Sequence, residues 1–236
     1  MTSIKDLKEE LWRLADPEKA KVLQRFFRTG PGQYGEGDIF LGVVVPKTRK
    51  LARKYHDLGL GDAVDLLRSP IHEERLLALL ILVSKFQKAD PETRERIFSL
   101  YLGNTRNINN WDLVDLSAEH IVGAFLMSRG KKILSTLARS ESLWEKRIAI
   151  LATFHYIKKG MPEPTLAVAK ILINDRHDLI HKAVGWMLRE VGKRCGEAVE
   201  EAFLRLHYKR MPRTMLRYAI ERFPERKRRA YLDGTA

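Results

Sequence analysis

The stretch KAVGWMLREVGKR, residues 182–194, decides the fold class of this chain. Its apolar residues recur with the 3.6-residue period of a helix that buries one face. Three further stretches have this period or are apolar all round: LLALLILVSKF (76–86), LVDLSAEHIVGAFL (113–126) and KRIAILATFHYI (146–157). Short segments such as KADPET and KKGMPEPT separate them, and no set of alternating strands is found. The sequence therefore predicts an all-α protein.

A period of about 35 residues relates these helical stretches. Residues just before or within successive apolar runs are separated by 36, 36, 35 and 35 positions: Arg75, Trp111, Arg147, Lys182 and Arg217. Stacked antiparallel helix pairs produce such a period, because each unit buries its apolar stripe against the next. An antiparallel bundle is the competing fold, but it does not explain why polar or aromatic residues recur at one place. We therefore predict a helical-repeat solenoid.

We expect a single domain over residues 1–236, made of three parts. A helical cap covers about residues 1–60, the repeats cover about 61–225, and a basic tail covers 226–236. The cap contains a loop at 30–42 with five glycines, which is unusual in an all-α protein. The loop lacks the Gly-Lys-Ser/Thr ending of a phosphate-binding P-loop. We expect a long, tight connection between two helices, with DNA contact as the functional alternative.

The formal charge of +13 is distributed unevenly, with +3 in residues 1–100 and +10 in residues 101–236. Such an excess favours polyanionic partners, because a protein that neutralises phosphates releases condensed counterions. A solvated basic surface, an acidic membrane surface and RNA are the alternatives. Duplex DNA is the partner that charge and distribution together favour.

The repeat gives this charge a predicted location. Equivalent positions of a solenoid line the same face, and one face is concave. Arg147, Lys182 and Arg217 would then form a cationic strip beside Trp111 and Asp115, in a concave basic groove suited to a duplex backbone. The structural alternative is that these cations cap helices or pair with neighbouring acidic residues.

The chain has the features of a cytoplasmic protein. Its longest run without Asp, Glu, Lys or Arg is ten residues, 148–157, which is too short to span a bilayer at about 20 residues. The N-terminal residues lack the apolar stretch of a secretory signal, and a lone Cys195 cannot form an internal disulfide. His177 and His181 have i,i+4 spacing, but without further ligands we expect capping or surface roles, no metal and no cofactor.

The stretch NINNWDLVDLSAEH, residues 107–120, holds the candidate chemistry. Asn109 or Asn110 is expected to cap a helix. The following Asp112 suits the helix dipole and is assigned no catalytic role. Trp111 and Asp115 are four residues apart, so they share a face. A carboxylate in positive surroundings can stabilise a developing cation and orient water, as glycosidic cleavage requires, although such pairs are usually structural.

Three motifs, NNWDLVD, LWEKRIAIL and KAVGWMLRE, occur in an order and spacing that resembles the AlkD family of DNA alkylation-repair glycosylases, built from HEAT-like repeats. The resemblance extends from KAKVLQRFFRTG through YGEGDIFLGV to RYAIERF. It implies that Asp115 is catalytic, that Trp111 and Trp186 contact the lesion nucleotide, and that Arg147 binds phosphate. A family tyrosine appears here as Phe26, which keeps the ring and loses the hydroxyl.

Arg189 could reach phosphate from the helix that carries Trp186, or be held by Glu190 in a salt bridge. Trp12 is expected to pack at the N-terminus, and Trp144 is expected to brace the repeat of Arg147. Their sequence surroundings give neither tryptophan a role in DNA contact.

The resemblance implies excision of cationic N3- or N7-alkylated purines from duplex DNA, without a base-flipping pocket. We expect a monomer associated with the nucleoid. A non-catalytic solenoid for damaged or branched DNA is the first alternative, and a protein-binding helical scaffold is the second.

Overall fold

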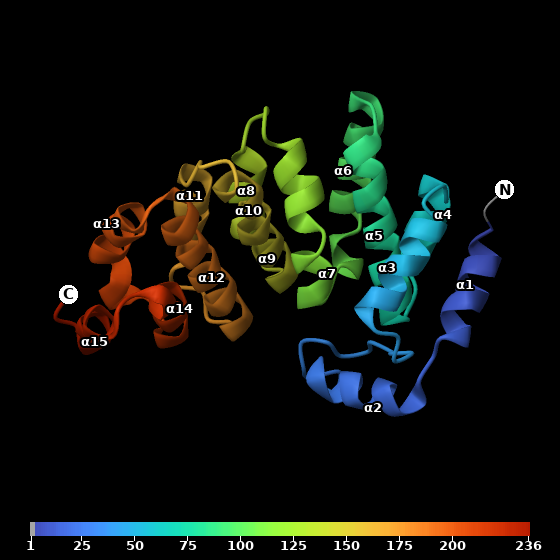
Figure 1. Ribbon diagram of the computed structural model, residues 1–236, viewed down its shortest axis with the longest axis horizontal. Helices are drawn as coiled ribbons and strands as arrows, with labels where there is room; N and C mark the ends of the chain where they lie inside the picture. Colours follow the sequence, from blue (N-terminus) through green and yellow to red (C-terminus); the bar gives the residue numbers. More distant parts are fainter. Residues whose placement is uncertain (1–2) are drawn as a thin grey trace. The chain divides into compact units, whose positions relative to one another are not determined.

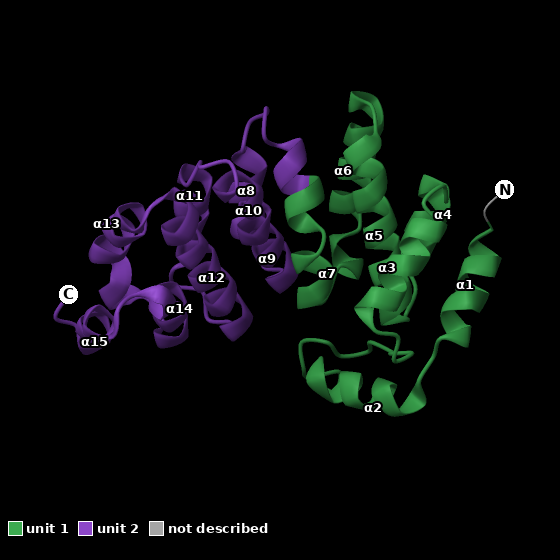
Figure 2. Cartoon of the chain, in the orientation of Figure 1, with its two compact units in different colours: residues 1–121 green, residues 122–236 purple. Residues whose placement is uncertain are grey.

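The computed structural model describes residues 3–236 and is built from helices joined by short turns (Figure 1). Within that range no strand forms, and the β pairing found is an isolated parallel bridge between Ile39 and Ile71. The all-α prediction is confirmed. The chain divides into two compact units, residues 1–121 and 122–236 (Figure 2). No helix among the described residues is both long and apolar enough to cross a bilayer.

The first unit is built around one long helix. Its helices are α1 (Ile4–Arg13), α2 (Pro17–Phe26), α3 (Val45–Lys54), α4 (Leu60–Leu67), α5 (His72–Lys88), α6 (Pro91–Gly103) and α7 (Trp111–Asp115), with a 3₁₀ turn at Thr105–Asn107 and a π-helical turn at Glu119–Gly123 that reaches into the second unit. Helix α5 is buried on almost all sides, since α3, α4, α6 and α7 pack against it. This explains why residues 76–86 are apolar on all sides of the helix rather than amphipathic.

Helix α2 differs from the other long helices because it contains no buried residue. Asp16 caps it by accepting a hydrogen bond from the Lys19 N–H at 3.1 Å, and Pro17 occupies its first position. The loop that follows folds back onto the start of the helix, where the Asp16 N–H donates to the Leu41 carbonyl at 2.8 Å. Contacts at its N-terminal end therefore position α2.

The predicted glycine loop lies between α2 and α3, and a buried carboxylate shapes it. The Glu73 side chain accepts hydrogen bonds from the backbone N–H groups of Leu41, Gly42 and Val43 at 2.9, 2.8 and 3.1 Å. Gly42 has φ +85°, and a Cβ there would overlap the Asp16 carbonyl oxygen. Only glycine combines this backbone with so close an approach.

The second unit has the same kind of construction. Its helices are α8 (Lys132–Ala138), α9 (Leu143–Ala152), α10 (Phe154–Ile157), α11 (Glu163–Leu172), α12 (Asp178–Cys195), α13 (Glu197–His207), α14 (Arg213–Ala219) and α15 (Glu225–Asp233), with 3₁₀ turns at Tyr208–Arg210 and Ile220–Arg222. Helix α12 packs against α9, α11, α13 and α14. A Cβ at Gly185 would overlap the Met215 carbonyl oxygen, so this glycine allows α12 and α14 to approach closely.

The predicted basic tail is largely helical. Helix α15 covers most of it, and the Tyr208 hydroxyl donates toward the carbonyl oxygens of Gly234 and Ala236, each at 3.0 Å. Tyr231 on α15 is buried and lies edge-on to the Tyr208 ring. These contacts attach the end of the chain to the second unit.

Candidate functional site

Helix α7 presents two residues of the candidate site on one face. The Asn110 side-chain oxygen accepts a hydrogen bond from the Trp111 N–H at 2.9 Å, so Asn110, one of the two predicted candidates, is the cap. Asp112, Leu113 and Val114 are buried. Trp111 and Asp115, at the two ends of this short helix, are both partly exposed. The predicted sharing of a face is therefore confirmed, while the roles of both residues remain predictions.

Two aromatic rings at the end of α2 contact Trp111, and a ring of the glycine loop extends the stack. The Phe27 ring stacks on Trp111 with centroids 5.0 Å apart and an interplanar angle of 12°, and on Phe40 at 4.9 Å and 22°. Phe26 lies edge-on to Trp111 at 5.9 Å, with 62% of its surface exposed. Because such ring pairs add stability beyond their area burial, this column limits the movement of Trp111. The structure thus brings Phe26 and Trp111 together.

A buried cluster of charges, not anticipated from the sequence, lies behind this aromatic column. His72, the first residue of α5, places Nδ1 3.0 Å from Asp38 Oδ2 and Nε2 2.9 Å from Asp112 Oδ2. Arg75 binds the other oxygen of Asp38, and the Asn110 amide donates to Asp38 Oδ2 at 3.2 Å. We call these five residues the His72 cluster, and all of them are buried.

The carboxylates determine the charge of His72. Burial alone would lower the pKa of the imidazole, but Asp112 and Asp38 outweigh it and raise that pKa to about 9. Burial would raise the pKa of Asp38, but hydrogen bonding to His72 and the charge of Arg75 lower it. His72 is therefore an imidazolium at neutral pH and donates from both nitrogens.

The helix-dipole explanation of Asp112 was incomplete. Its Oδ1 accepts the Leu113 N–H at 2.9 Å, close to the helix start as expected, but its Oδ2 is the partner of His72. The two partners of His72 lie 34 and 40 positions away in the sequence, at Asp38 and Asp112. No local spacing rule connects residues so far apart.

Lys182, Trp186 and Arg189 lie on the partly exposed face of α12 in the second unit. Lys182 forms an i,i+4 ion pair with Asp178 at 2.7 Å, and Trp186 lies 5.9 Å from the Phe154 ring. These contacts leave the predicted roles of Lys182 and Trp186 in DNA binding untested.

The alternative that Glu190 holds Arg189 in a salt bridge is wrong. Arg189 pairs with Glu221, whereas Glu190 is buried and accepts from Arg194 Nε at 2.9 Å. Consecutive residues of a helix point to different faces, and a neighbouring element supplies the partner instead.

The remaining predicted phosphate contacts differ in exposure. Arg147 is only 5% exposed, and its Nη1 donates to the Leu179 carbonyl at 2.6 Å near the start of α12. Arg217 on α14 is exposed. It lines a cavity of about 520 Å³ together with Arg189, Thr214, Tyr218, Glu221 and Arg228. Arg189 and Arg217 are thus brought together in one cationic cavity.

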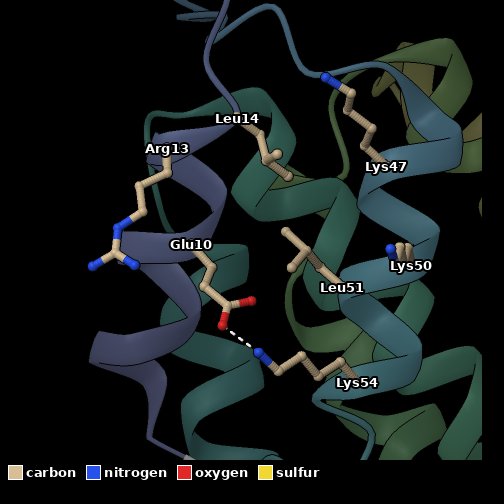
Figure 3. A pocket seen from close by; sticks show the side chains of 7 residues that line it. All are labelled: Glu10, Arg13, Leu14, Lys47, Lys50, Leu51 and Lys54. Carbon is tan, nitrogen blue, oxygen red and sulfur yellow. Dashed lines mark hydrogen bonds and ion pairs between the residues drawn. The ribbon is translucent and has the colours of Figure 1, made fainter.

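A second cavity, of about 550 Å³, lies between α1 and α3 (Figure 3). It is lined by Glu10, Arg13, Leu14, Lys47, Lys50, Leu51 and Lys54. Glu10 and Lys54 form an ion pair across it, with leucine side chains between the two helices (Figure 3). None of the predicted site residues lines this cavity.

The histidine pair of α12 has the expected capping role. His177 Nδ1 accepts from the Leu179 N–H at 3.1 Å, and His181 Nε2 lies 2.6 Å from the Asp175 carbonyl oxygen. Within residues 3–236 no group of three or more His, Cys, Asp or Glu side chains is arranged to hold a metal ion. Burial raises the pKa of the Cys195 thiol, which disfavours a reactive thiolate.

One tryptophan departs from its expected place. Trp12 is 52% exposed rather than packed, and its Nε1–H donates to Glu74 Oε1 at 3.3 Å. Its amphipathic helix α1 buries Leu7 and Leu11, which leaves the neighbouring position outside the core. Trp144 is buried in the second unit, as expected of a bracing residue.

Comparisons with known proteins place the chain among DNA repair proteins. Residues 7–223 match the model of a family described as DNA alkylation repair enzyme. A solved structure, described as a predicted DNA alkylation repair enzyme from Enterococcus faecalis, is 16% identical with a TM-score of 0.69, and the match covers 89% of this chain and 97% of that chain. At that identity the likeness shows the fold, and it confirms the helical-repeat prediction. No curated protein has a significantly similar sequence.

Proposed function

Because the chain belongs to the DNA alkylation repair enzyme family, we propose that it is a DNA glycosylase that removes cationic N3- or N7-alkylated purines from duplex DNA. The observation that carries this proposal is helix α7. Trp111 and Asp115 remain partly exposed on an otherwise buried helix, with the exposed ring of Phe26 beside Trp111. An aromatic surface and a carboxylate are thus presented together.

The proposed reaction suits a single carboxylate. An alkylated purine carries a positive charge, so when the N-glycosidic bond breaks, the base leaves with the bonding electrons as a neutral molecule and needs no general acid. The main contribution to the activation free energy is the positive charge that develops on the sugar as the transition state acquires oxocarbenium character. Asp115 stabilises that positive charge and orients a water molecule, whose oxygen adds to the anomeric carbon and whose proton passes to the carboxylate.

The aromatic residues position the lesion nucleotide. Trp111, held by its stack on Phe27, and the exposed Phe26 contact the deoxyribose and its backbone. A cationic base near these rings gains about 0.5–2 kcal/mol from cation–π attraction. Trp186 provides a second indole for the same contact.

The cations of the second unit bind the DNA backbone in this proposal. Arg217 is exposed, whereas Arg189 exchanges its ion pair with Glu221 for a phosphate. Lys182 contributes a further charge. Arg147, which is 5% exposed, exchanges its hydrogen bond to the Leu179 carbonyl for a phosphate near the lesion. No base-flipping pocket, metal or cofactor is needed, and the protein acts as a monomer on the nucleoid in the cytoplasm.

Base release from methylated duplex DNA tests this function. The protein is incubated with duplex DNA carrying 7-methylguanine and 3-methyladenine, and free bases are separated and quantified against undamaged duplex. We expect time-dependent release of an alkylated base from the methylated duplex and no release of base from the undamaged duplex. Tight, salt-sensitive binding without release would contradict the glycosylase and favour a non-catalytic damage binder.

A further inference from the structure

The position of His72 links the buried charges to the exposed site. Its imidazolium contacts Asp112 on α7 at 2.9 Å, one residue after Trp111, and Asp38 in the glycine loop at 3.0 Å. Asn110, the cap of α7, also donates to Asp38. The residues on either side of Trp111 are therefore both members of the His72 cluster.

The ring of His72 supports Trp111 by a second route. It stacks on Phe40 with centroids 4.3 Å apart and an interplanar angle of 21°, and lies 5.1 Å from Phe27. Phe27 in turn stacks on Trp111. A cation beside two rings adds attraction to their packing, so hydrogen bonds and stacking from one side chain both converge on α7.

Helix α7 needs such support because it is short. It has five residues, fewer than an isolated helix requires to persist in water. The positions that carry Trp111 and Asp115 are therefore fixed by tertiary contacts rather than by the helix itself. The imidazolium also balances the buried charge, since with Arg75 it offsets the carboxylates of Asp38 and Asp112.

We propose that His72 is a positioning residue: a buried imidazolium that bridges Asp38 and Asp112 and thereby holds Trp111 and Asp115 in their reactive placement. This inference rests on the proposed glycosylase function, and His72 itself contacts no substrate. It couples the glycine loop to α7, so the loop has a role in catalysis without contacting DNA through its glycines.

The proposal predicts a dependence of excision on pH. The charged groups that face His72 are Asp38 from the loop and Asp112 from α7, with Arg75 of its own helix behind Asp38, while Phe27 and Phe40 cover the ring. Deprotonation removes one hydrogen-bond donor and leaves a net negative charge in the cluster. Excision should therefore decline as the pH rises through about 9.

The test combines excision kinetics with direct observation of the imidazole. His72→Gln is compared with His56→Gln, a control at an exposed histidine of the same unit. We expect His72→Gln to lower the single-turnover rate constant about 10- to 100-fold, the loss that a small misplacement of reacting groups produces. DNA affinity should stay within about threefold of the wild type because no phosphate contact is removed. A folded His72→Gln that excises at the wild-type rate would overturn the proposal.

Nitrogen-15 NMR of the histidine rings gives a readout that does not depend on activity. Both nitrogens of His72 should remain protonated at pH 7.5. Asp112→Asn should move the titration of His72 to lower pH and shift the Trp111 indole resonance. If His72→Gln fails to fold, Asp112→Asn supplies the same kinetic comparison. A neutral His72 at pH 7.5 would also overturn the proposal. Absence of base release by the wild type would instead refute the glycosylase function and leave the NMR result to decide the bridge.

Discussion

Replacing Gly42 by alanine tests how the glycine loop holds α2. Gly42 has φ +85°, and an added Cβ would overlap the Asp16 carbonyl oxygen and lie 2.8 Å from the Ala20 nitrogen. Both atoms belong to the backbone at the start of α2, so no side chain can rotate away. Gly37 in the same loop has φ +84° but no heavy atom within 4 Å of the added Cβ. Gly37→Ala is therefore a matched control for the backbone conformation alone.

The magnitude follows from these two contributions. A non-glycine residue in the left-handed region costs about 1–2 kcal/mol, and both variants carry that cost. Overpacking against a fixed backbone costs a further 1–3 kcal/mol, roughly, at Gly42 alone. Gly42→Ala should therefore unfold at a melting temperature about 2–12 °C below that of Gly37→Ala, at about 2–4 °C per kcal/mol for a chain of this size.

Thermal unfolding by circular dichroism measures this difference, and base release shows its functional consequence. Displacing the start of α2 should also move Phe26 and Phe27 relative to Trp111, so Gly42→Ala should excise more slowly than Gly37→Ala. Equal melting temperatures for the two variants would refute the argument that Gly42 is required for the close approach to α2.

Three further outcomes are expected. Burial, with a contribution from Glu197, raises the pKa of Glu200 to about 8, so stability should be lost as the pH rises from about 4.5 through 8. Glu200→Gln should be about 4 kcal/mol more stable than wild type at pH 8 and equal at pH 4, as urea unfolding would show. Arg217→Ala should reduce the slope of log affinity for DNA against log salt by about 0.9, whereas the exposed Arg96→Ala should not, and equal slopes would remove Arg217 from the interface. Glu73→Gln should cost roughly 2–4 kcal/mol in urea unfolding, because an amide cannot accept all three N–H groups of the loop, and a neutral effect would contradict that role.

Helical periodicity predicted helices at the stretches that overlap α5, α7, α9 and α12. A cap at Asn109 or Asn110 and the shared face of Trp111 and Asp115 follow from local spacing, because both depend on residues within one helical turn. The histidines of α12 were also assigned correctly, since capping is a local interaction.

The partners across elements could not be predicted from spacing. His72 opens a stretch of polar residues at the start of α5, and its two carboxylates come from a loop and from another helix. Arg189 reaches Glu221 rather than Glu190 in an arrangement where Gly185 lets α14 approach α12. Such pairings depend on which helices pack together. The hydrophobic period shows which face of a helix is buried, but it does not show which helix packs against that face.

In the proposed reaction Asp115 performs the chemistry, at a site presented by α7. Single-turnover base release from methylated duplex DNA tests it most directly, comparing the wild type with Asp115→Asn and with Asp65→Asn, a control at an exposed aspartate of the same unit. We predict that Asp115→Asn loses at least about 100-fold in rate, in the range expected for removing an electrostatic stabiliser of the transition state, with DNA affinity nearly unchanged. Release by Asp115→Asn at the rate of the wild type and of Asp65→Asn would contradict the assignment.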